Sequence, residues 1–175
     1  MNKAILFPDL QTARTNSSAS PEEAELLYAL VRNLKPKVCL ETGTHKGYAS
    51  IHIGKALEDN GEGHLWTCDP KDWGAKDLIN GVAWSNRITY LQIKGKDFKS
   101  EQKIDFMFCD GFHEKEVVVE EMKSILPQLN KNAVVVFHDA GEDNEFCGVN
   151  GAVKELGLKS CWLPTQNCLI IYCHQ

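Results

Sequence analysis

The stretch VCLETGTHKGYAS, residues 38–50, decides the fold, because an apolar strand passes directly into two glycines and a helix start. In open α/β sheets, ligands bind where such a strand ends. Gly43 and Gly47 let a ligand approach the backbone, and the helix dipole favours negative charge there. Glu41, however, stands where a dinucleotide-binding turn has its first glycine. A carboxylate at that place repels a pyrophosphate and can pair with an ammonium group.

Strand-like and helix-like segments alternate on both sides of this stretch. Ser20 caps a helix with Glu23 in a capping box, and Pro36 ends it. Further helices are expected at 48–57, after His113 and at 149–156. Strands are expected at 38–41, 65–68, 88–93, 104–109 and 133–137. Alternation of this kind predicts a mostly parallel sheet with helices on both faces.

The end of the chain departs from this alternation. Two strand-like segments, 160–163 and 168–172, are separated by only a short turn. A parallel return needs a crossover of roughly a dozen residues or more, so these segments form an antiparallel hairpin.

Composition limits the classes of protein to consider. A length of 175 residues with 43% hydrophobic residues fits one domain. We divide it into an N-terminal extension, 1–19, and a domain, 20–175. The net charge of -5 comes without a basic run, which argues against nucleic acid as a partner. Neither a secretory signal nor a membrane span is evident, so we expect a cytoplasmic protein without membrane contact.

Seven cysteines are present without a CxxC pair. Several lie in apolar runs, where a thiol behaves as a small hydrophobic group. We therefore expect buried, reduced thiols rather than zinc ligands or disulfides.

Asp69 ends the second strand, where an acidic side chain can accept hydrogen bonds from both ribose hydroxyls of a nucleoside. The alternative is a plain turn residue. Together with Glu41 and the glycine turn, it favours a nucleoside ligand with a cationic amino-acid end.

These motifs, together with DGFH at 110–113, resemble the class I S-adenosylmethionine (SAM)-dependent methyltransferases. The likeness is to the small branch with cephalosporin hydroxylase-like proteins and sugar O-methyltransferases. It implies a Rossmann-like three-layer α/β sandwich whose seven-stranded sheet has the order 3-2-1-4-5-7-6, with an antiparallel C-terminal hairpin. It also implies a set of cofactor-binding residues: Glu41, Gly43, Thr44, Gly47, Ser50, Asp69, Asp97, Phe98 and Asp110.

A second group contains Asp110, His113, His138 and Asp139. Asp110 and Asp139 follow two strands expected to be adjacent, so these candidate catalytic side chains should meet at one edge of the sheet. Clustered carboxylates require a cation or a proton between them. We expect either a metal held by Asp110, His138 and Asp139, or a histidine that acts as general base.

The resemblance implies a divalent metal here, but this chain has His138 in place of an acidic residue and Phe112 in place of a common Asp. Oxygen ligands suit Mg²⁺, whereas a histidine admits Mn²⁺, Fe²⁺ or Zn²⁺. The alternative is that His113 caps its helix and His138 binds a loop.

Three features allow two interpretations each. In the first, one of the two tryptophans Trp73 and Trp84 stacks on a ligand; the alternative is that both pack in the core. The loop 141–148 covers the acceptor or is a solvated connection. Lys46 binds the methionine carboxylate or points into solvent.

We therefore predict a SAM-dependent O-methyltransferase that acts on a small-molecule or glycan hydroxyl, with a homodimer as an expected assembly. The alternatives are a non-catalytic SAM-binding module, a nucleotide-dependent Rossmann oxidoreductase or isomerase, and a metal-dependent hydrolase.

Overall fold

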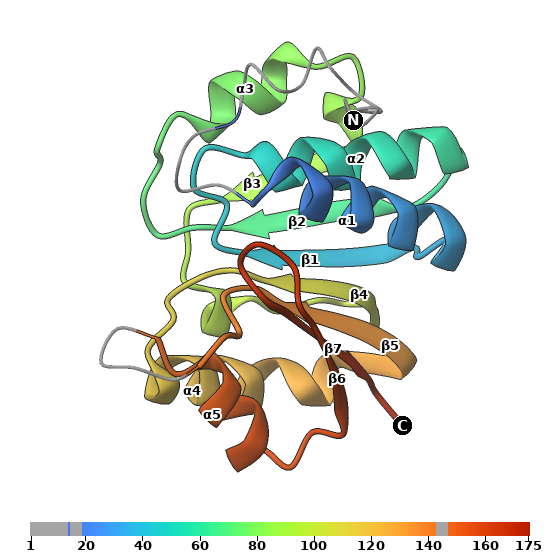
Figure 1. Cartoon of the computed structure of the whole chain (residues 1–175). Coiled ribbons are helices and arrows are strands. Elements are labelled where there is room, and N and C mark those ends of the chain that lie inside the picture. Colours follow the sequence, from blue (N-terminus) through green and yellow to red (C-terminus); the bar gives the residue numbers. More distant parts are fainter. Residues whose placement is uncertain (1–13, 15–18, 143–146) are drawn as a thin grey trace, which may run out of the picture.

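A seven-stranded sheet forms the centre of the computed structural model, with helices on both faces (Figure 1). The structure describes residues 14, 19–142 and 147–175. The predicted extension 1–19 therefore lies almost wholly outside the described residues, as does part of the loop 141–148. The strands are β1 Val38–Thr42, β2 His64–Cys68, β3 Ile88–Leu91, β4 Ile104–Cys109, β5 Leu129–Phe137, β6 Ser160–Leu163 and β7 Leu169–Cys173.

The strand order is β3-β2-β1-β4-β5-β7-β6. Strands β1 to β5 pair in parallel, while β7 pairs antiparallel with both β5 and β6. The predicted Rossmann-like fold and its C-terminal hairpin are confirmed. This order places the ends of β1, β2, β4 and β5 along one edge, where the candidate site lies.

The helices are α1 Pro21–Leu34, α2 Tyr48–Asn60, α3 Ala75–Gly81, α4 Lys115–Ile125 and α5 Val149–Glu155. Alternate side chains of each strand pack on opposite helix layers. In β4, Phe106 and Phe108 pack with the α1 and α2 side, and Met107 packs with the α4 and α5 side. The sheet is thus covered on both faces, as its parallel strands require.

Helix α3 is not evident from the sequence, because only seven residues form it and they follow Gly74. Ala75 and Ile79 are buried and pack the helix against the layer that contains α2. Strand β3 ends at Leu91, two residues before the predicted boundary.

None of the seven cysteines, all within the described residues, forms a disulfide. Cys39, Cys68 and Cys109 are buried, but the prediction of buried thiols is wrong for Cys161 and Cys173. These two are exposed because β6 is an edge strand and Cys173 ends β7. No described helix combines the length and apolarity needed to cross a bilayer.

Gly43 is the position at which the β1–α2 turn meets the end of β4. Its φ is +86°, a value that side chains rarely adopt, and a Cβ atom there would overlap the backbone carbonyl of Asp110. The glycine therefore allows two neighbouring strand ends to lie in direct backbone contact.

We expect Gly43→Ala to lower the free energy of unfolding by about 2–5 kcal/mol, because a left-handed backbone and an overpacked contact both cost energy. Gly61→Ala is the matched control, since Gly61 has a φ of +76° but nothing within 4 Å of its Cβ position. Urea denaturation measures both variants. Equal losses in the two would show that the contact with Asp110 contributes nothing.

Candidate active site

A cleft of about 630 Å³ opens at the carboxyl ends of the strands. Its walls include Gly43 after β1, Asp69 after β2, Gly95 after β3, and both Asp110 and Asp139 after β4 and β5. The volume lies within the usual range for small-molecule sites, roughly 300–1,000 Å³. A smaller recess of about 20 Å³, lined by Glu41, Thr44 and Asp110 among others, adjoins the same turn.

Glu41 has no contact with bulk solvent, with 1% of its surface exposed. Its Oε2 accepts a hydrogen bond from the Ser50 hydroxyl, and Oε1 has no hydrogen-bond partner among the described residues. Burial raises the pKa of Glu41 to about 8, although the Ser50 bond opposes the shift. Ser50 therefore acts on the site through Glu41.

The residues on either side of the glycine turn are also buried. The hydroxyl groups of Thr44 and Thr67 lie 2.6 Å apart. Gly47, with a φ of +85°, precedes α2 and leaves the first amides of that helix without a side-chain cap. These amides and the helix dipole favour an anionic group at the turn.

Asp69 lies at the end of β2 and lines the cleft. Its Oδ2 accepts the His45 amide at 2.9 Å, and its Oδ1 accepts the Lys71 amide at 2.9 Å. Both bonds hold the carboxylate in one orientation and leave it further lone pairs for a ligand.

Two predicted cofactor residues do not reach this cleft. Phe98 is 3% exposed and packs in the core, and Asp97 lies exposed in a short 3-10 helix, Gly95–Asp97. That helix turns the chain so that Lys94, Gly95 and Lys96 form the cleft wall instead.

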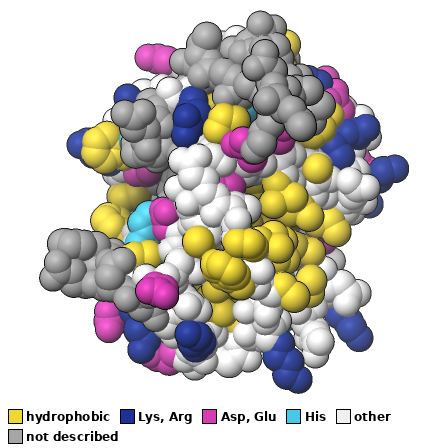
Figure 2. Space-filling model, viewed as in Figure 1, with side chains coloured by type: hydrophobic (Ala, Val, Ile, Leu, Met, Phe, Trp, Pro, Cys, Tyr) yellow, Lys and Arg dark blue, Asp and Glu magenta, His cyan; other side chains and the backbone are white. Residues whose placement is uncertain are grey.

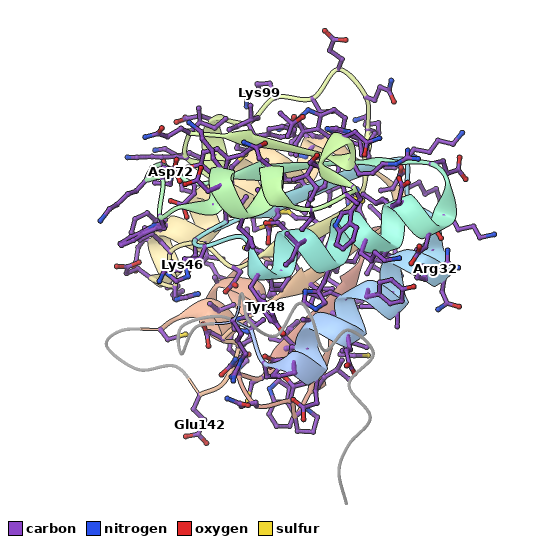
Figure 3. All side chains as sticks on the ribbon, turned by 90° about the horizontal axis from the view of Figure 1, so that it is seen from above. Arg32, Lys46, Tyr48, Asp72, Lys99 and Glu142 are labelled. Atoms are coloured by element: carbon purple, nitrogen blue, oxygen red, sulfur yellow. The ribbon has the colours of Figure 1, made fainter. Side chains whose placement is uncertain are left out.

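The tryptophans divide between the two interpretations. Trp73 is 44% exposed and lines the cleft, with the Lys71 ammonium 3.6 Å from its ring centre. Trp84 donates its Nε1–H to the Ile51 carbonyl at 2.9 Å and packs on α2. Lys46 is exposed and lies at the outer side of the molecule, whereas buried Tyr48 lies nearer its centre (Figure 3).

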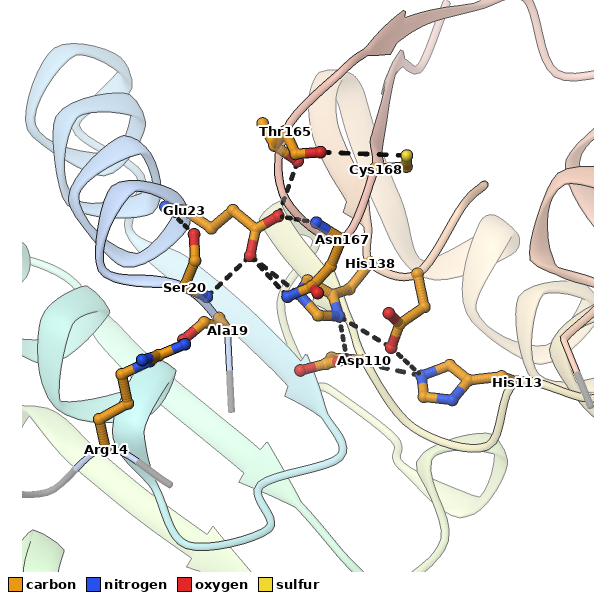
Figure 4. A network of polar contacts seen from close by, with 11 residues as sticks. Arg14, Ala19, Ser20, Glu23, Asp110, His113, His138, Thr165, Asn167 and Cys168 are labelled. Atoms are coloured by element: carbon orange, nitrogen blue, oxygen red, sulfur yellow. Dashed lines mark hydrogen bonds and ion pairs between the residues drawn. The ribbon is translucent and has the colours of Figure 1, made fainter. Parts of the chain in front are cut away.

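Asp110, His113, His138 and Asp139 meet beside the cleft, as predicted, with their nearest ligand atoms all within 4.8 Å of one another (Figure 4). His138 Nδ1 lies 2.9 Å from Asp110 Oδ1 and 3.1 Å from Asp139 Oδ2. Figure 2 shows a histidine and an acidic side chain together on the left flank of the molecule.

The chain also matches a known protein family. Residues 40–140, more than half of the chain, match the model of a family described as a methyltransferase domain. The chain belongs to this methyltransferase family. The predicted family is thereby confirmed, and the matched residues include the ends of strands β1 to β5 and the start of the loop after β5.

Solved structures share the fold of this methyltransferase. An O-methyltransferase from Bacillus cereus in complex with SAH has a TM-score of 0.77 at 16% identity, covering 98% of this chain and 89% of that one. The O-methyltransferase TomG from Streptomyces achromogenes in complex with SAM has a TM-score of 0.73 at 18% identity, covering 96% and 90%. The SAH-bound methyltransferase PaMTH1 from Podospora anserina has a TM-score of 0.74 at 16% identity, covering 95% and 86%. At these identities the likeness shows a common fold.

Glu23 is the site residue of the methyltransferase that the sequence analysis missed. It was predicted only as part of a capping box, which is present: Ser20 Oγ accepts the Glu23 amide and Glu23 Oε2 accepts the Ser20 amide. Glu23 is fully buried, and its Oε2 also lies 3.3 Å from His138 Nε2 (Figure 4). Burial alone would raise the pKa of Glu23, but the hydrogen bonds around it hold the pKa far below its usual range.

Carboxylates surround His138 on both ring edges. Burial alone would lower its pKa, but Asp110, Asp139 and Glu23 raise the pKa of His138 to about 12. A histidine with this pKa keeps its proton at neutral pH, which argues against His138 as the general base. Burial likewise opposes ionisation of Asp110, but the two histidines hold its pKa below the usual range.

His113 does not cap α4, since Glu114 occupies the N-cap position. Its Nε2 lies 3.2 Å from Asp139 Oδ2 and 3.5 Å from Asp110 Oδ1, yet it makes no hydrogen bond of acceptable geometry with any described residue. The nearby Asp110 carboxylate raises the pKa of His113.

The four side chains fit the divalent metal that the family resemblance implies. Ligand atoms held 2.0–2.2 Å from one ion, as is usual for roughly tetrahedral or octahedral sites, lie about 3 Å apart. The four closest separations in this cluster, 2.9, 3.1, 3.2 and 3.5 Å, are of that size. His113 Nε2 lies between the two carboxylates without a hydrogen-bond partner among the described residues, which is a further sign of a fit.

Glu121 is a second residue that the sequence analysis did not single out. It lines the cleft, and its Oε1 accepts the Thr42 hydroxyl at 2.7 Å. Burial raises the pKa of Glu121. The signal was its helical spacing from buried Val118 and Ile125, which places residue 121 on the inner face of α4.

Proposed function

We propose that this methyltransferase moves the methyl group of SAM to an oxygen of a small-molecule acceptor. The proposal rests mainly on one observation: Glu41 and Asp69, at adjacent strand ends, flank a glycine turn that opens into a cleft containing Asp110, His113 and Asp139. The carboxyl groups suit the ammonium and ribose groups of SAM, and the cluster suits a hydroxyl that must lose a proton. Membership of the methyltransferase family and the SAM- and SAH-bound relatives support this assignment.

The reaction requires little covalent chemistry from the protein. The acceptor oxygen attacks the methyl carbon in line with the carbon–sulfur bond, and that bond's electron pair passes to the sulfonium sulfur. The products are a methyl ether, S-adenosylhomocysteine (SAH) and the proton released by the hydroxyl. Positioning of the two reactants can therefore supply much of the rate.

We assign contact with the acceptor hydroxyl to His113 and Asp139, whose side chains are 33% and 38% exposed and line the cleft. Half-buried Asp110 and buried His138 hold these two groups in place. A divalent ion at Asp110, His138 and Asp139 would lower the pKa of a bound hydroxyl. The proton leaves toward the carboxylate of Asp139, which is the group nearest to solvent.

The cleft wall favours an acceptor or adenine ring with a flat apolar face. Trp73, Phe112 and Val117 are large, exposed hydrophobic residues that line it. Phe112 is 59% exposed, at the position where the related motif commonly has an acidic residue. Aromatic faces of this kind stack on planar rings. A phenolic acceptor therefore fits this wall better than a sugar does.

We expect isothermal titration to give micromolar binding of SAM and SAH and none of NAD, because Glu41 occupies the place of the first glycine of a dinucleotide-binding turn. Asp69→Ala should weaken SAM binding by about 1–3 kcal/mol through the lost acceptor. Asp72→Ala is the control, since its carboxylate lies in the same loop but contacts the Gly74 amide and the Lys76 ammonium and does not line the cleft. Equal affinity of SAM for wild type and Asp69→Ala would remove the ribose assignment, and absence of SAM binding would overturn the function.

A proton measurement tests Glu41. With a pKa of about 8 it is mostly neutral at pH 7, and the ammonium of SAM would stabilise its ionised form. Binding at pH 7 should therefore release up to about one proton from Glu41, whereas none should be released near pH 9, where the group is already ionised. Titrations in buffers of different ionisation enthalpy count these protons. Glu41→Gln should release fewer; an identical proton count in both proteins would contradict the pairing.

We also propose a second copy of this chain as a partner. Strand β6 is an edge strand whose first three residues are exposed, and Trp162 is 55% exposed. Figure 2 shows hydrophobic side chains gathered over this hairpin. Unprotected edges of this kind favour pairing with another chain.

Light scattering should then give twice the chain mass of 19.6 kDa, and Trp162→Lys should give the mass of one chain. The matched surface control is Leu34→Lys, at an exposed residue that ends α1. A wild-type mass of one chain at all concentrations would exclude the homodimer.

A further inference from the structure

We propose that Asp110, His113, His138 and Asp139 bind a first-row transition-metal dication in preference to Mg²⁺ or Ca²⁺, and that Glu23 is the positioning residue that orients His138 toward it. This inference rests on the proposed function only for the role of the metal beside the acceptor hydroxyl. The choice of ion follows from the donor atoms, and the role of Glu23 follows from its contacts.

The donor set contains two imidazole nitrogens and two carboxylate oxygens. Mg²⁺ and Ca²⁺ are bound in proteins mainly by oxygen ligands. Imidazole suits zinc, iron and their neighbours in the first transition row. Two carboxylate ligands also balance the charge of one dication. The cluster therefore favours an ion such as Zn²⁺, Co²⁺ or Mn²⁺.

His113 supplies the observation that an acidic cluster alone would lack. Its Nε2 is buried, lies within 3.2–3.5 Å of two carboxylates and has no hydrogen-bond partner among the described residues. This nitrogen forms ion pairs with both carboxylates, and an ion between the three groups would take the place of those pairs. Asp110 Oδ1 and Asp139 Oδ2 each face both histidines.

His138 is fixed from its other edge. Glu23 Oε2 and Asn167 Nδ2 lie 3.3 and 3.2 Å from Nε2, and a proton on Nε2 points at Glu23. Nδ1 faces Asp110 and Asp139, and on releasing the proton it shares with them it would present its lone pair to an ion between the two carboxylates. A carboxylate on the distal nitrogen is the usual partner of a metal-binding histidine.

Glu23 is itself held by both ends of the fold. The Thr165 hydroxyl and the Asn167 amide donate to Oε1 at 2.7 and 2.9 Å, and Asn167 Nδ2 donates to Oε2 at 2.9 Å. The Ser20 amide donates to Oε2 at 2.8 Å. With this many bonds the carboxylate has little freedom to turn away from His138.

The test uses the full chain after dialysis against EDTA. Titration with ZnCl₂, CoCl₂, MnCl₂ and MgCl₂ should give one site that binds Zn²⁺ and Co²⁺ at least about 10-fold more tightly than Mg²⁺. The bound Co²⁺ should show visible absorption bands that change in His113→Ala, a variant at a partly exposed residue. His113→Ala should lose at least about 10-fold in Zn²⁺ affinity and little in Mg²⁺ affinity.

Glu23→Gln should lower Zn²⁺ affinity by roughly 10–100-fold. Thr165→Val is the matched control, because it removes one hydrogen bond to Glu23 without touching His138. If Glu23→Gln does not fold, nitrogen NMR of the Zn²⁺ form decides: His138 must carry its proton on Nε2 and the metal on Nδ1. The opposite tautomer, or unchanged Zn²⁺ affinity in folded Glu23→Gln, would overturn the positioning role.

Equal affinity for Zn²⁺ and Mg²⁺, no metal binding, or a wild-type Co²⁺ spectrum in His113→Ala would overturn the metal assignment. Titration of SAM into the metal-free protein separates the two proposals. SAM binding without any metal binding would overturn the metal site and leave the proposed function standing. Metal binding without SAM binding would overturn the proposed function and leave the metal site standing.

Discussion

A buried carboxylate, Glu23, sets the constraint on which much of this fold depends. A charge without solvent is tolerated only when hydrogen bonds and an opposite charge surround it. This chain meets that condition by bringing three distant segments together: the start of α1, His138 after β5, and the β6–β7 turn. The sheet order agrees with this arrangement. Because β7 runs antiparallel to β5, the turn between β6 and β7 lies at the edge of the sheet where β5 ends and the site begins.

The site uses its acidic residues in two protonation states. Glu41 is buried and Glu121 is half-buried, and the loss of solvent raises the pKa values of both and favours the neutral form. Glu23 is buried and Asp110 half-buried, but the histidines and hydrogen bonds beside them lower the pKa values of both and favour the ionised form. Near Glu41, a bound cation would therefore stabilise the ionised carboxylate. Near Asp110 and Glu23, the protonated His138 supplies the positive charge.

Much of this could be read from the sequence because local patterns determine it. Strand ends, the glycine turn and the Ser20 capping box depend on neighbouring residues, and the Asp110–Asp139 cluster follows from adjacent parallel strands. Glu23 could not be assigned to the site, because its role depends on Thr165 and Asn167, more than 140 positions away. Asp97 and Phe98 stay predictions as cofactor residues, since Asp97 is exposed in the 3-10 helix Gly95–Asp97 and Phe98 packs in the core, and neither lines the cleft. Sequence patterns locate the strand ends well but not the contacts made by the loops between them.

The hairpin contacts of Glu23 also bear on how the protein is made. Three of the hydrogen bonds to this carboxylate come from Thr165 and Asn167, in the turn between β6 and β7. Domains can begin to fold during synthesis, from the N-terminus onward. A nascent chain that ends before residue 165 has the strands β1 to β5 but lacks these three bonds. The orientation of His138 is therefore completed only when the hairpin emerges, so a partly synthesised chain can have the sheet without the finished site.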